Sequence, residues 1–257
     1  MDLGHRGKTV IVTGGSKGIG SGISEVFAKE GANLVINYHS DSVSSEAFSK
    51  ELMDKYGCKA ICAQGDVGNE ADVKSIFDAA EEYFDRVDIL INNAGKVYTN
   101  KVTDISLEEW NKCLKDNLTG QFLMSREFAR RVVLKKQKGW IVNVVSKAAM
   151  MSTTKGRLAY VSNKAGEWGL THALAVELTE YGIRVNGVMP GHVMNSRLVK
   201  EMENNPEGFK QRINRSPIKR VGEPWEIGNM VAFLASEQCA LAVGSVVDVT
   251  GGLLLGF

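Results

Sequence analysis

The sequence predicts an α/β protein with a doubly wound parallel sheet of seven strands and helices on both faces. Short, β-branched and nearly continuous apolar runs predict strands that are covered on both sides. Helical stretches separate most of these runs, and strand–helix–strand alternation favours parallel pairing through right-handed crossovers. The seven expected strands are Thr9–Thr13, Asn33–Asn37, Lys59–Gln64, Val87–Asn92, Trp140–Val145, Arg184–Met189 and Ser245–Val249.

The expected helices carry apolar residues at spacings of three and four. Two of them are long, near Leu107–Lys135 and Arg157–Tyr181, and exceed what one face of a sheet needs. A length of 257 residues suits one α/β unit, so we expect a single domain over residues 1–257.

Composition excludes several classes of protein. The chain has 31 Lys plus Arg against 30 Asp plus Glu, so its net charge of +1 gives no global attraction to nucleic acid or anionic lipid. No apolar run approaches the roughly 20 residues that span a bilayer, and the first residues lack the apolar stretch of a signal peptide. The four cysteines form neither a disulfide framework nor a zinc pattern. We therefore expect a cytoplasmic protein with no metal site that binds neither nucleic acid nor membranes.

A glycine-rich turn follows the first expected strand and opens a helix. Ligands of doubly wound sheets bind beyond the carboxyl ends of the strands, so this turn is a candidate site. Glycines leave the backbone bare, and a pyrophosphate can then approach the free N–H groups of the helix N-terminus. A purely structural turn is the alternative. The candidate nucleotide contacts here are Gly14, Ser16, Lys17, Gly18, Ile19 and Gly20.

The end of the second expected strand bears on which nucleotide binds. Sites for NAD typically carry a carboxylate there, but this strand ends in Asn37, Tyr38, His39 and Ser40, and Asp41 comes late. Without an acid, Lys17 can face a 2′-phosphate, which favours NADP(H) over NAD(H). The alternative is that Lys17 is a solvated surface lysine. The candidate contacts at this strand end are Asn37, His39 and Ser40.

Two further strand ends carry turn-forming residues in register with the glycine turn. Asp66 and Val67 follow the third expected strand, where the carboxylate can accept the adenine amino group. Asn93, Ala94 and Gly95 follow the fourth, where the backbone can approach the adenosine ribose. Either motif alone is also compatible with a plain turn.

A Tyr/Lys pair is the candidate for proton transfer. Tyr160 and Lys164 are four residues apart, so they share one face of a helix. A nearby ammonium favours tyrosinate and lowers the phenol pKa from about 10, which makes Tyr160 a plausible general acid or base. Ser146, at the end of the fifth strand, can donate to a carbonyl oxygen. Asn117 lies inside a long helix, where its amide can bend the helix and hold a water next to Lys164.

Taken together, these motifs resemble the short-chain dehydrogenases/reductases in their single-domain form. The resemblance covers nearly the whole chain. It rests on Thr13–Gly20, Asp66, Asn92–Gly95, Asn117, Ser146, Tyr160 with Lys164, Arg184-Val185-Asn186, Pro190-Gly191 and Gly251-Gly252. It implies a Rossmann-type fold and hydride transfer between NAD(P)(H) and an alcohol/carbonyl pair.

The resemblance also implies roles for the catalytic residues. Tyr160 would be the acid/base, Lys164 would bind the nicotinamide ribose and lower the pKa of Tyr160, and Ser146 would polarise the carbonyl. Asn117 would support a proton-relay water. Pro190, Gly191 and Val193 would hold the nicotinamide carboxamide, with Val193 acting through its backbone. Asn195 stands where the family often has Thr, and Lys147 stands where a small residue is usual. Lys147 can either contact the substrate or point to solvent, and we expect it to point to solvent.

The segment 192–220 is expected to form a small helical flap over the substrate. It holds seven Lys or Arg (Arg197, Lys200, Lys210, Arg212, Arg215, Lys219, Arg220) against three Glu, and Lys155 and Arg157 lie in the other substrate loop. The charges indicate either an anionic substrate or a solvated amphipathic helix.

The most favoured function is an NADP(H)-dependent oxidoreductase that interconverts a carbonyl and a secondary alcohol. Sugar, polyol or sugar-acid dehydrogenase, 3-oxoacyl reductase and hydroxysteroid-type dehydrogenase remain open as substrate classes. A nucleotide-binding regulator without activity is the alternative from another class, although it would not need the acid/base residues. A nucleotide-sugar epimerase or dehydratase would usually need a longer chain. The family resemblance implies a homo-oligomer, a dimer or tetramer.

Overall fold

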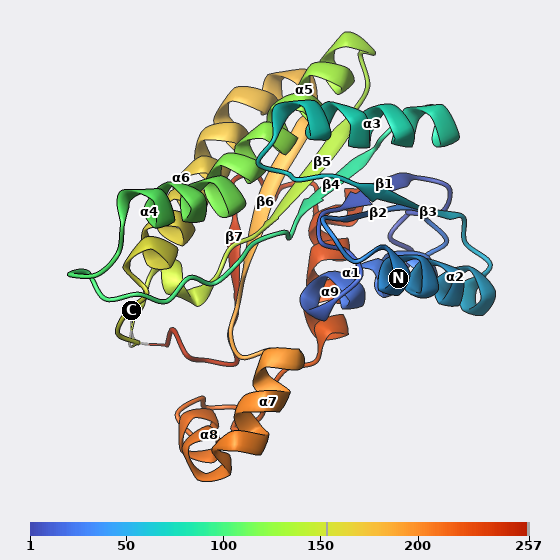
Figure 1. The fold of residues 1–257 in the computed structure, drawn as a ribbon. Helices are drawn as coiled ribbons and strands as arrows, with labels where there is room; N and C mark the ends of the chain where they lie inside the picture. Colours follow the sequence, from blue (N-terminus) through green and yellow to red (C-terminus); the bar gives the residue numbers. More distant parts are fainter. Residues whose placement is uncertain (153, 256–257) are drawn as a thin grey trace.

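The seven expected strands form one parallel sheet in the computed structural model, which describes residues 1–152 and 154–255. Their order is β3-β2-β1-β4-β5-β6-β7 (Figure 1). Successive strands are added outward from β1 on one side up to β3, and from β4 onward they are added on the other side. This confirms the predicted doubly wound sheet. The strands are β1 (Thr9–Val12), β2 (Asn33–Tyr38), β3 (Ala60–Gln64), β4 (Ile89–Asn92), β5 (Gly139–Val144), β6 (Ile183–Pro190) and β7 (Val246–Val249).

Helices cover both faces of the sheet (Figure 1). One face carries α1 (Gly18–Lys29), α2 (Ser42–Tyr56) and α9 (Pro224–Leu234), and the other carries α3 (Glu70–Phe84), α5 (Gly120–Leu134) and α6 (Leu158–Leu178). Each face has its own apolar core, with Phe27 and Val231 in the first and Phe77 and Phe128 in the second. Strands β1, β4 and β5 are buried throughout, which explains why their sequences are nearly continuous apolar runs.

The first of the two long expected helices is interrupted. Helix α4 (Leu107–Leu114) leads into a π-helical turn, Lys115–Thr119, and α5 follows directly. Asn117 sits inside this turn, and its Nδ2 donates to the carbonyl oxygen of Cys113, 2.9 Å away. The turn is therefore the irregularity that an Asn inside a long helix indicated, and π turns of this kind are frequent at functional sites.

Two short helices, α7 (Ser196–Asn204) and α8 (Pro206–Ile213), stand off the carboxyl ends of the strands as a separate lobe (Figure 1). They occupy the segment in which a helical flap was expected. Asn195 begins α7 by accepting hydrogen bonds from the N–H groups of Arg197 and Leu198, each at 3.0 Å. No helix in the described part of the chain is both long and apolar enough to cross a membrane.

Candidate active site

The glycine turn after β1 is built so that only glycine fits. Gly14 and Gly18 have φ of 59° and 53°, in the left-handed region that favours glycine. A Cβ on Gly20 would overlap the carbonyl oxygen of Gly14. Lys17 precedes α1 and gives it no side-chain cap, so the N–H groups of the first helical turn are available to an anion. This geometry fits a dinucleotide pyrophosphate.

The turn after β4 is joined to the glycine turn by hydrogen bonds. The Oγ1 of Thr13 accepts from the backbone N–H groups of Asn93 and Ala94, at 2.8 and 2.9 Å. The Nδ2 of Asn93 donates to the carbonyl oxygen of Thr13 at 2.8 Å. A Cβ on Gly95 would lie only 2.8 Å from the Oδ1 of Asn117. The structure thus brings Asn93, Ala94 and Gly95 next to the glycine turn.

The side chain of Asn37, by contrast, forms hydrogen bonds with the backbone at the ends of neighbouring strands. Its side chain is buried, and its Nδ2 donates to the carbonyl oxygens of Ala63 and Gly65, both at 3.1 Å. Its Oδ1 accepts from the N–H of Gly14 at 3.4 Å. These contacts hold three strand ends together and do not favour a direct cofactor contact from Asn37. Of the other candidates here, His39 and Ser40 are exposed beyond β2, and Ser16 accepts a hydrogen bond from Ser45.

Lys17 forms an ion pair with Asp41. Both side chains reach solvent, with exposed fractions of 63% and 41%. Asp41 also caps α2 by accepting from the N–H of Ser44 at 3.1 Å. The hydrogen bonds from Lys17 and Ser44 hold the pKa of the Asp41 carboxyl below its usual range. The cap therefore places Asp41 next to Lys17, although two residues separate Asp41 from the end of β2.

Asp66 is engaged in a similar way. Its Oδ2 lies 2.8 Å from the Nζ of Lys115, and its Oδ1 accepts from the N–H of Gly68 at 2.8 Å. Burial alone would raise the pKa of Asp66, but these hydrogen bonds outweigh burial and lower it. Val67 is buried against Gly120. An adenine contact from Asp66 stays a prediction, and it would have to share the carboxylate with Lys115.

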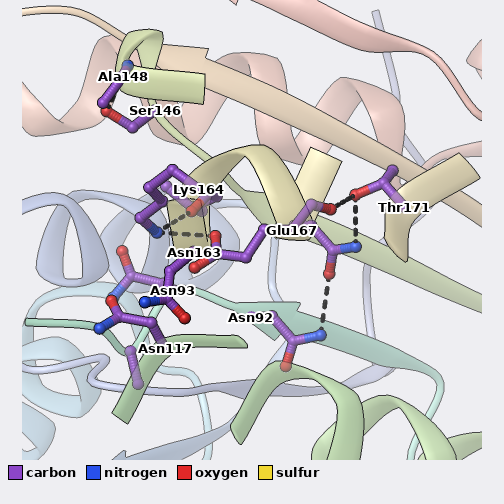
Figure 2. Close-up of polar contacts among 12 residues, drawn as sticks. Asn92, Asn93, Asn117, Ser146, Ala148, Asn163, Lys164, Glu167 and Thr171 are labelled. Atoms are coloured by element: carbon purple, nitrogen blue, oxygen red, sulfur yellow. Dashed lines mark hydrogen bonds and ion pairs between the residues drawn. The ribbon is translucent and has the colours of Figure 1, made fainter. Parts of the chain in front are cut away.

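A cavity of about 330 Å³ opens at the carboxyl ends of β5 and β6. Among the predicted site residues it gathers Ile19, Ser146, Tyr160, Pro190, Gly191, Val193 and Asn195. Ser146 follows β5, and its Oγ accepts from the N–H of Ala148 at 3.1 Å, which leaves the hydroxyl hydrogen free to donate (Figure 2). Tyr160 comes from the first turn of α6 and is half-buried.

Lys164 lies behind Tyr160, with its Nζ 5.8 Å from the centroid of the Tyr160 ring. It is buried, and its Nζ donates to the carbonyl oxygen of Val144 at 3.2 Å and to the Oε2 of Glu167 at 2.8 Å (Figure 2). Burial alone would lower the pKa of Lys164, but the charges of Glu167 and Tyr160 outweigh it and raise the pKa. Lys164 therefore keeps its charge beside the phenol.

Glu167 is a further residue of the site that was not predicted from the sequence. Its carboxylate is only 2% exposed, although Glu is rarely buried in full. The available signal was its position three residues after Lys164, on the same helical face. It adjoins a chain of buried hydrogen bonds in which Asn92 donates to Asn143, Asn143 donates to Thr171, and Thr171 donates to the carbonyl oxygen of Glu167. Figure 2 labels Asn92, Thr171 and Glu167 of this chain. This chain crosses from β4 through β5 to α6.

The expectation that Lys147 points to solvent is wrong. Lys147 is half-buried and lines the cavity directly after Ser146. Ser146 caps a 3₁₀ turn, Lys147–Ala149, and this turn keeps the segment against the cavity wall. Burial, with the nearby charges of Arg157 and Arg212, lowers the pKa of Lys147.

The basic residues of the two substrate loops divide into two groups. Arg157, Arg197, Arg212 and Arg215 line the cavity, whereas Lys155, Lys200, Lys210, Lys219 and Arg220 do not. Arg220 instead pairs with Glu226 at 2.6 Å. The structure thus gathers only part of the predicted positive charge at the site.

The chain belongs to the short-chain dehydrogenase/reductase family of oxidoreductases, which act on alcohol/carbonyl pairs with nicotinamide cofactors. The family model described as "Enoyl-(Acyl carrier protein) reductase" matches residues 14–254. Among curated relatives, glucose 1-dehydrogenase 2 of Bacillus subtilis is 32% identical over 97% of this chain and 95% of its own length. The 3-oxoacyl-(acyl-carrier-protein) reductase FabG of Aquifex aeolicus is 34% identical over 98% of this chain and 100% of its own length.

Solved structures agree with this assignment. L-sorbose reductase of Gluconobacter frateurii, solved with NADPH and L-sorbose, superimposes with a TM-score of 0.94. It is 28% identical, and the match covers 100% of both chains.

Proposed function

We propose that this protein is an NADP(H)-dependent oxidoreductase that interconverts a carbonyl and a secondary alcohol, with Tyr160 as the acid/base. One observation carries the proposal. Ser146 and Tyr160 line the same cavity as the first turn of α1 and the segment after β6, while the Lys164 cation lies behind the Tyr160 ring. A proton donor, a hydrogen-bond donor and a nucleotide-binding turn therefore meet at one place.

Each residue of the site has a separate role in the proposed reaction. NADP(H), when bound, supplies or accepts the hydride. In the reductive direction the Tyr160 hydroxyl gives its proton to the carbonyl oxygen, and Lys164 stabilises the phenolate that remains. Ser146 donates its free hydroxyl hydrogen to the same oxygen, where negative charge develops. Asn117 holds the segment at Lys96 in place, since its Oδ1 accepts from the Lys96 N–H at 3.1 Å. The proton-relay water at Asn117 remains part of the proposal.

The dinucleotide would be held by the N-terminus of α1, the turn at Asn93 and the segment after β6. The preference for NADP(H) rests on Lys17 and on the lack of a carboxylate within β2. Asp41 already pairs with Lys17. A 2′-phosphate would share or replace Asp41 as the partner of Lys17. The NADPH bound by L-sorbose reductase supports the same preference.

The test follows NADPH and NADH consumption, and the matching oxidations, by nicotinamide absorbance. The substrate panel covers ketoses, sugar acids, 3-oxoacyl thioesters and steroid ketones. We expect turnover of one class with NADPH preferred. Cofactor binding with no turnover of any class would favour the regulator instead, and absence of cofactor binding would refute the proposal. A dimer or tetramer and a cytoplasmic location stay predictions.

A further inference from the structure

The cavity beside Ser146 and Tyr160 has a strongly positive wall. Five cationic side chains line it, and none of the described lining residues is an Asp or Glu. Within the described part of the chain, Glu201 is the single carboxylate paired with any of the five, through Arg212 at 2.5 Å. The five are Lys147, Arg157, Arg197, Arg212 and Arg215.

Three of these cations are half-buried and lie close enough to repel one another. Burial lowers the pKa of Lys147 and of Arg157, and each is lowered further by the charge of Arg212. Burial and the charges of Lys147 and Arg212 lower the pKa of His192 to about 4, so this cavity residue is neutral at pH 7. Gathering three positive charges with one carboxylate partner away from water costs free energy, and an anionic ligand would offset that cost.

Some of the guanidinium donors are also unused. The Nε and Nη2 of Arg212 and the Nε of Arg157 are buried without a hydrogen-bond partner among the described residues. The Nε and Nη2 of arginine form one side of its planar fork, the arrangement that binds carboxylate or phosphate through two parallel hydrogen bonds. Arg212 therefore has a free fork while its Nη1 stays on Glu201.

These cations surround the reacting position rather than the dinucleotide. Lys147 directly follows Ser146, and Arg157 precedes Tyr160 by three residues. Arg212 comes from α8, in the lobe that stands off the strand ends, whereas the glycine turn lies at the start of α1. The positive wall is thus placed for a substrate.

We infer that the substrate is a carbonyl compound or alcohol that carries an anionic group, a phosphate ester or a carboxylate, bound by Lys147, Arg157 and Arg212. This inference rests on the proposed function, because that function defines which ligand occupies the cavity.

The test is calorimetric titration with inorganic phosphate and, separately, with gluconate, at constant ionic strength. Each titration is run with and without saturating NADP⁺, which covers the N-terminus of α1. We expect saturable binding of at least one anion, weakened about tenfold or more in Lys147→Met and in Arg212→Met. Lys210→Met is the matched control, since it removes a charge from the same helix as Arg212 but is exposed outside the cavity.

His192 gives a second readout that does not depend on activity. A bound anion raises its pKa, which NMR titration of the imidazole follows, and Lys147→Met reduces that effect. Stronger binding of phosphate than of gluconate identifies a phosphate ester as the group, and the reverse identifies a carboxylate.

Three results would overturn the inference: no saturable binding of either anion, binding that Lys147→Met and Arg212→Met leave unchanged, or an equal loss of NADP⁺ affinity in these variants. Failure of NADP⁺ to bind would instead refute the proposed function, while the anion titration would still report on the cavity.

Discussion

At the scale of single residues, the pair of Lys164 and Glu167 dominates the site. Both side chains are almost fully buried, at 6% and 2% exposure, and they lie 2.8 Å apart. A buried pair is costly to break from one side, because the remaining charge has neither water nor an opposite charge beside it. Glu167 thus fixes the position of Lys164, and Lys164 in turn supports Tyr160.

Glu167→Leu is expected to lower the free energy of unfolding by about 3 kcal/mol or more, because it leaves the Lys164 charge uncompensated. Chemical denaturation measures this. The double variant Lys164→Met with Glu167→Leu should recover most of the stability but none of the activity. If Glu167→Leu alone were as stable as the wild type, the buried pair would not contribute to stability as proposed.

Lys17 and Asp41 provide a second prediction at this scale. Lys17→Glu removes the cation offered to a 2′-phosphate and adds repulsion, so the preference for NADPH over NADH should fall by about tenfold or more. Asp41→Asn frees Lys17 and should shift the preference in the opposite direction. The ratio of kcat/KM for the two cofactors measures both effects. An unchanged ratio in Lys17→Glu would show that Lys17 is an ordinary surface lysine.

At the scale of elements, the start of α1 depends on the close approach of two backbone segments. Gly20 lies in α1, directly against the carbonyl oxygen of Gly14 and the side chain of Asn93. Any Cβ there would force the glycine turn away from the turn after β4. The same contact that selects glycine therefore fixes the shape of the proposed nucleotide site.

Gly20→Ala is expected to weaken NADPH binding by about tenfold or more, because the added Cβ would displace the glycine turn. A tenfold loss of affinity corresponds to about 1.4 kcal/mol. Fluorescence titration of NADPH measures it. Gly169→Ala is the matched control, because Gly169 lies in α6 with nothing within 4 Å of its added Cβ. It should leave binding unchanged and stabilise the protein by about 0.5–1 kcal/mol. Equal effects of the two substitutions would contradict the proposed role of the close contact at Gly20.

The sequence was most informative where one local rule decides the outcome. Apolar runs located all seven strands, and in β1, β4 and β5 burial on both faces accounts for these runs. The sequence was least informative where a turn or a long-range contact determines the position of a side chain. A 3₁₀ turn directs Lys147 into the cavity, and the cap of α2 brings Asp41 to Lys17. Glu167 resembled any solvated helical glutamate, since its burial depends on how α6 packs.

At the scale of the whole molecule, His5 links the N-terminal segment to the helical layer of α1 and α9. Its imidazole is fully buried, its Nε2 lies 2.9 Å from the carbonyl oxygen of Ala232, and its ring lies 4.9 Å from that of Phe27. Burial lowers the pKa of His5 from 6.5 to about 4. The folded protein therefore holds His5 neutral at pH values where the unfolded chain is protonated.

Stability should consequently depend on acidity. Between pH 6.5 and about 4 the unfolded chain binds the proton more tightly, so the free energy of unfolding falls as the pH falls. The shift corresponds to a loss of about 3 kcal/mol across this window. The measurement is denaturant unfolding from pH 7 to pH 4 for wild type and His5→Gln. The difference between their pH slopes isolates His5 from His192, and parallel slopes would contradict the assignment.

The proposed function depends above all on proton transfer by Tyr160, in a cavity shared with a bound nicotinamide cofactor. The most direct measurement compares wild type with Tyr160→Phe, recording kcat by NADPH absorbance and the NADPH dissociation constant on the same samples. We predict a loss in kcat of at least about a hundredfold with NADPH affinity nearly unchanged, since the substitution removes only the hydroxyl that moves the proton. Retention of most of the activity by Tyr160→Phe, with the cofactor still bound, would contradict the role of Tyr160 as the acid/base.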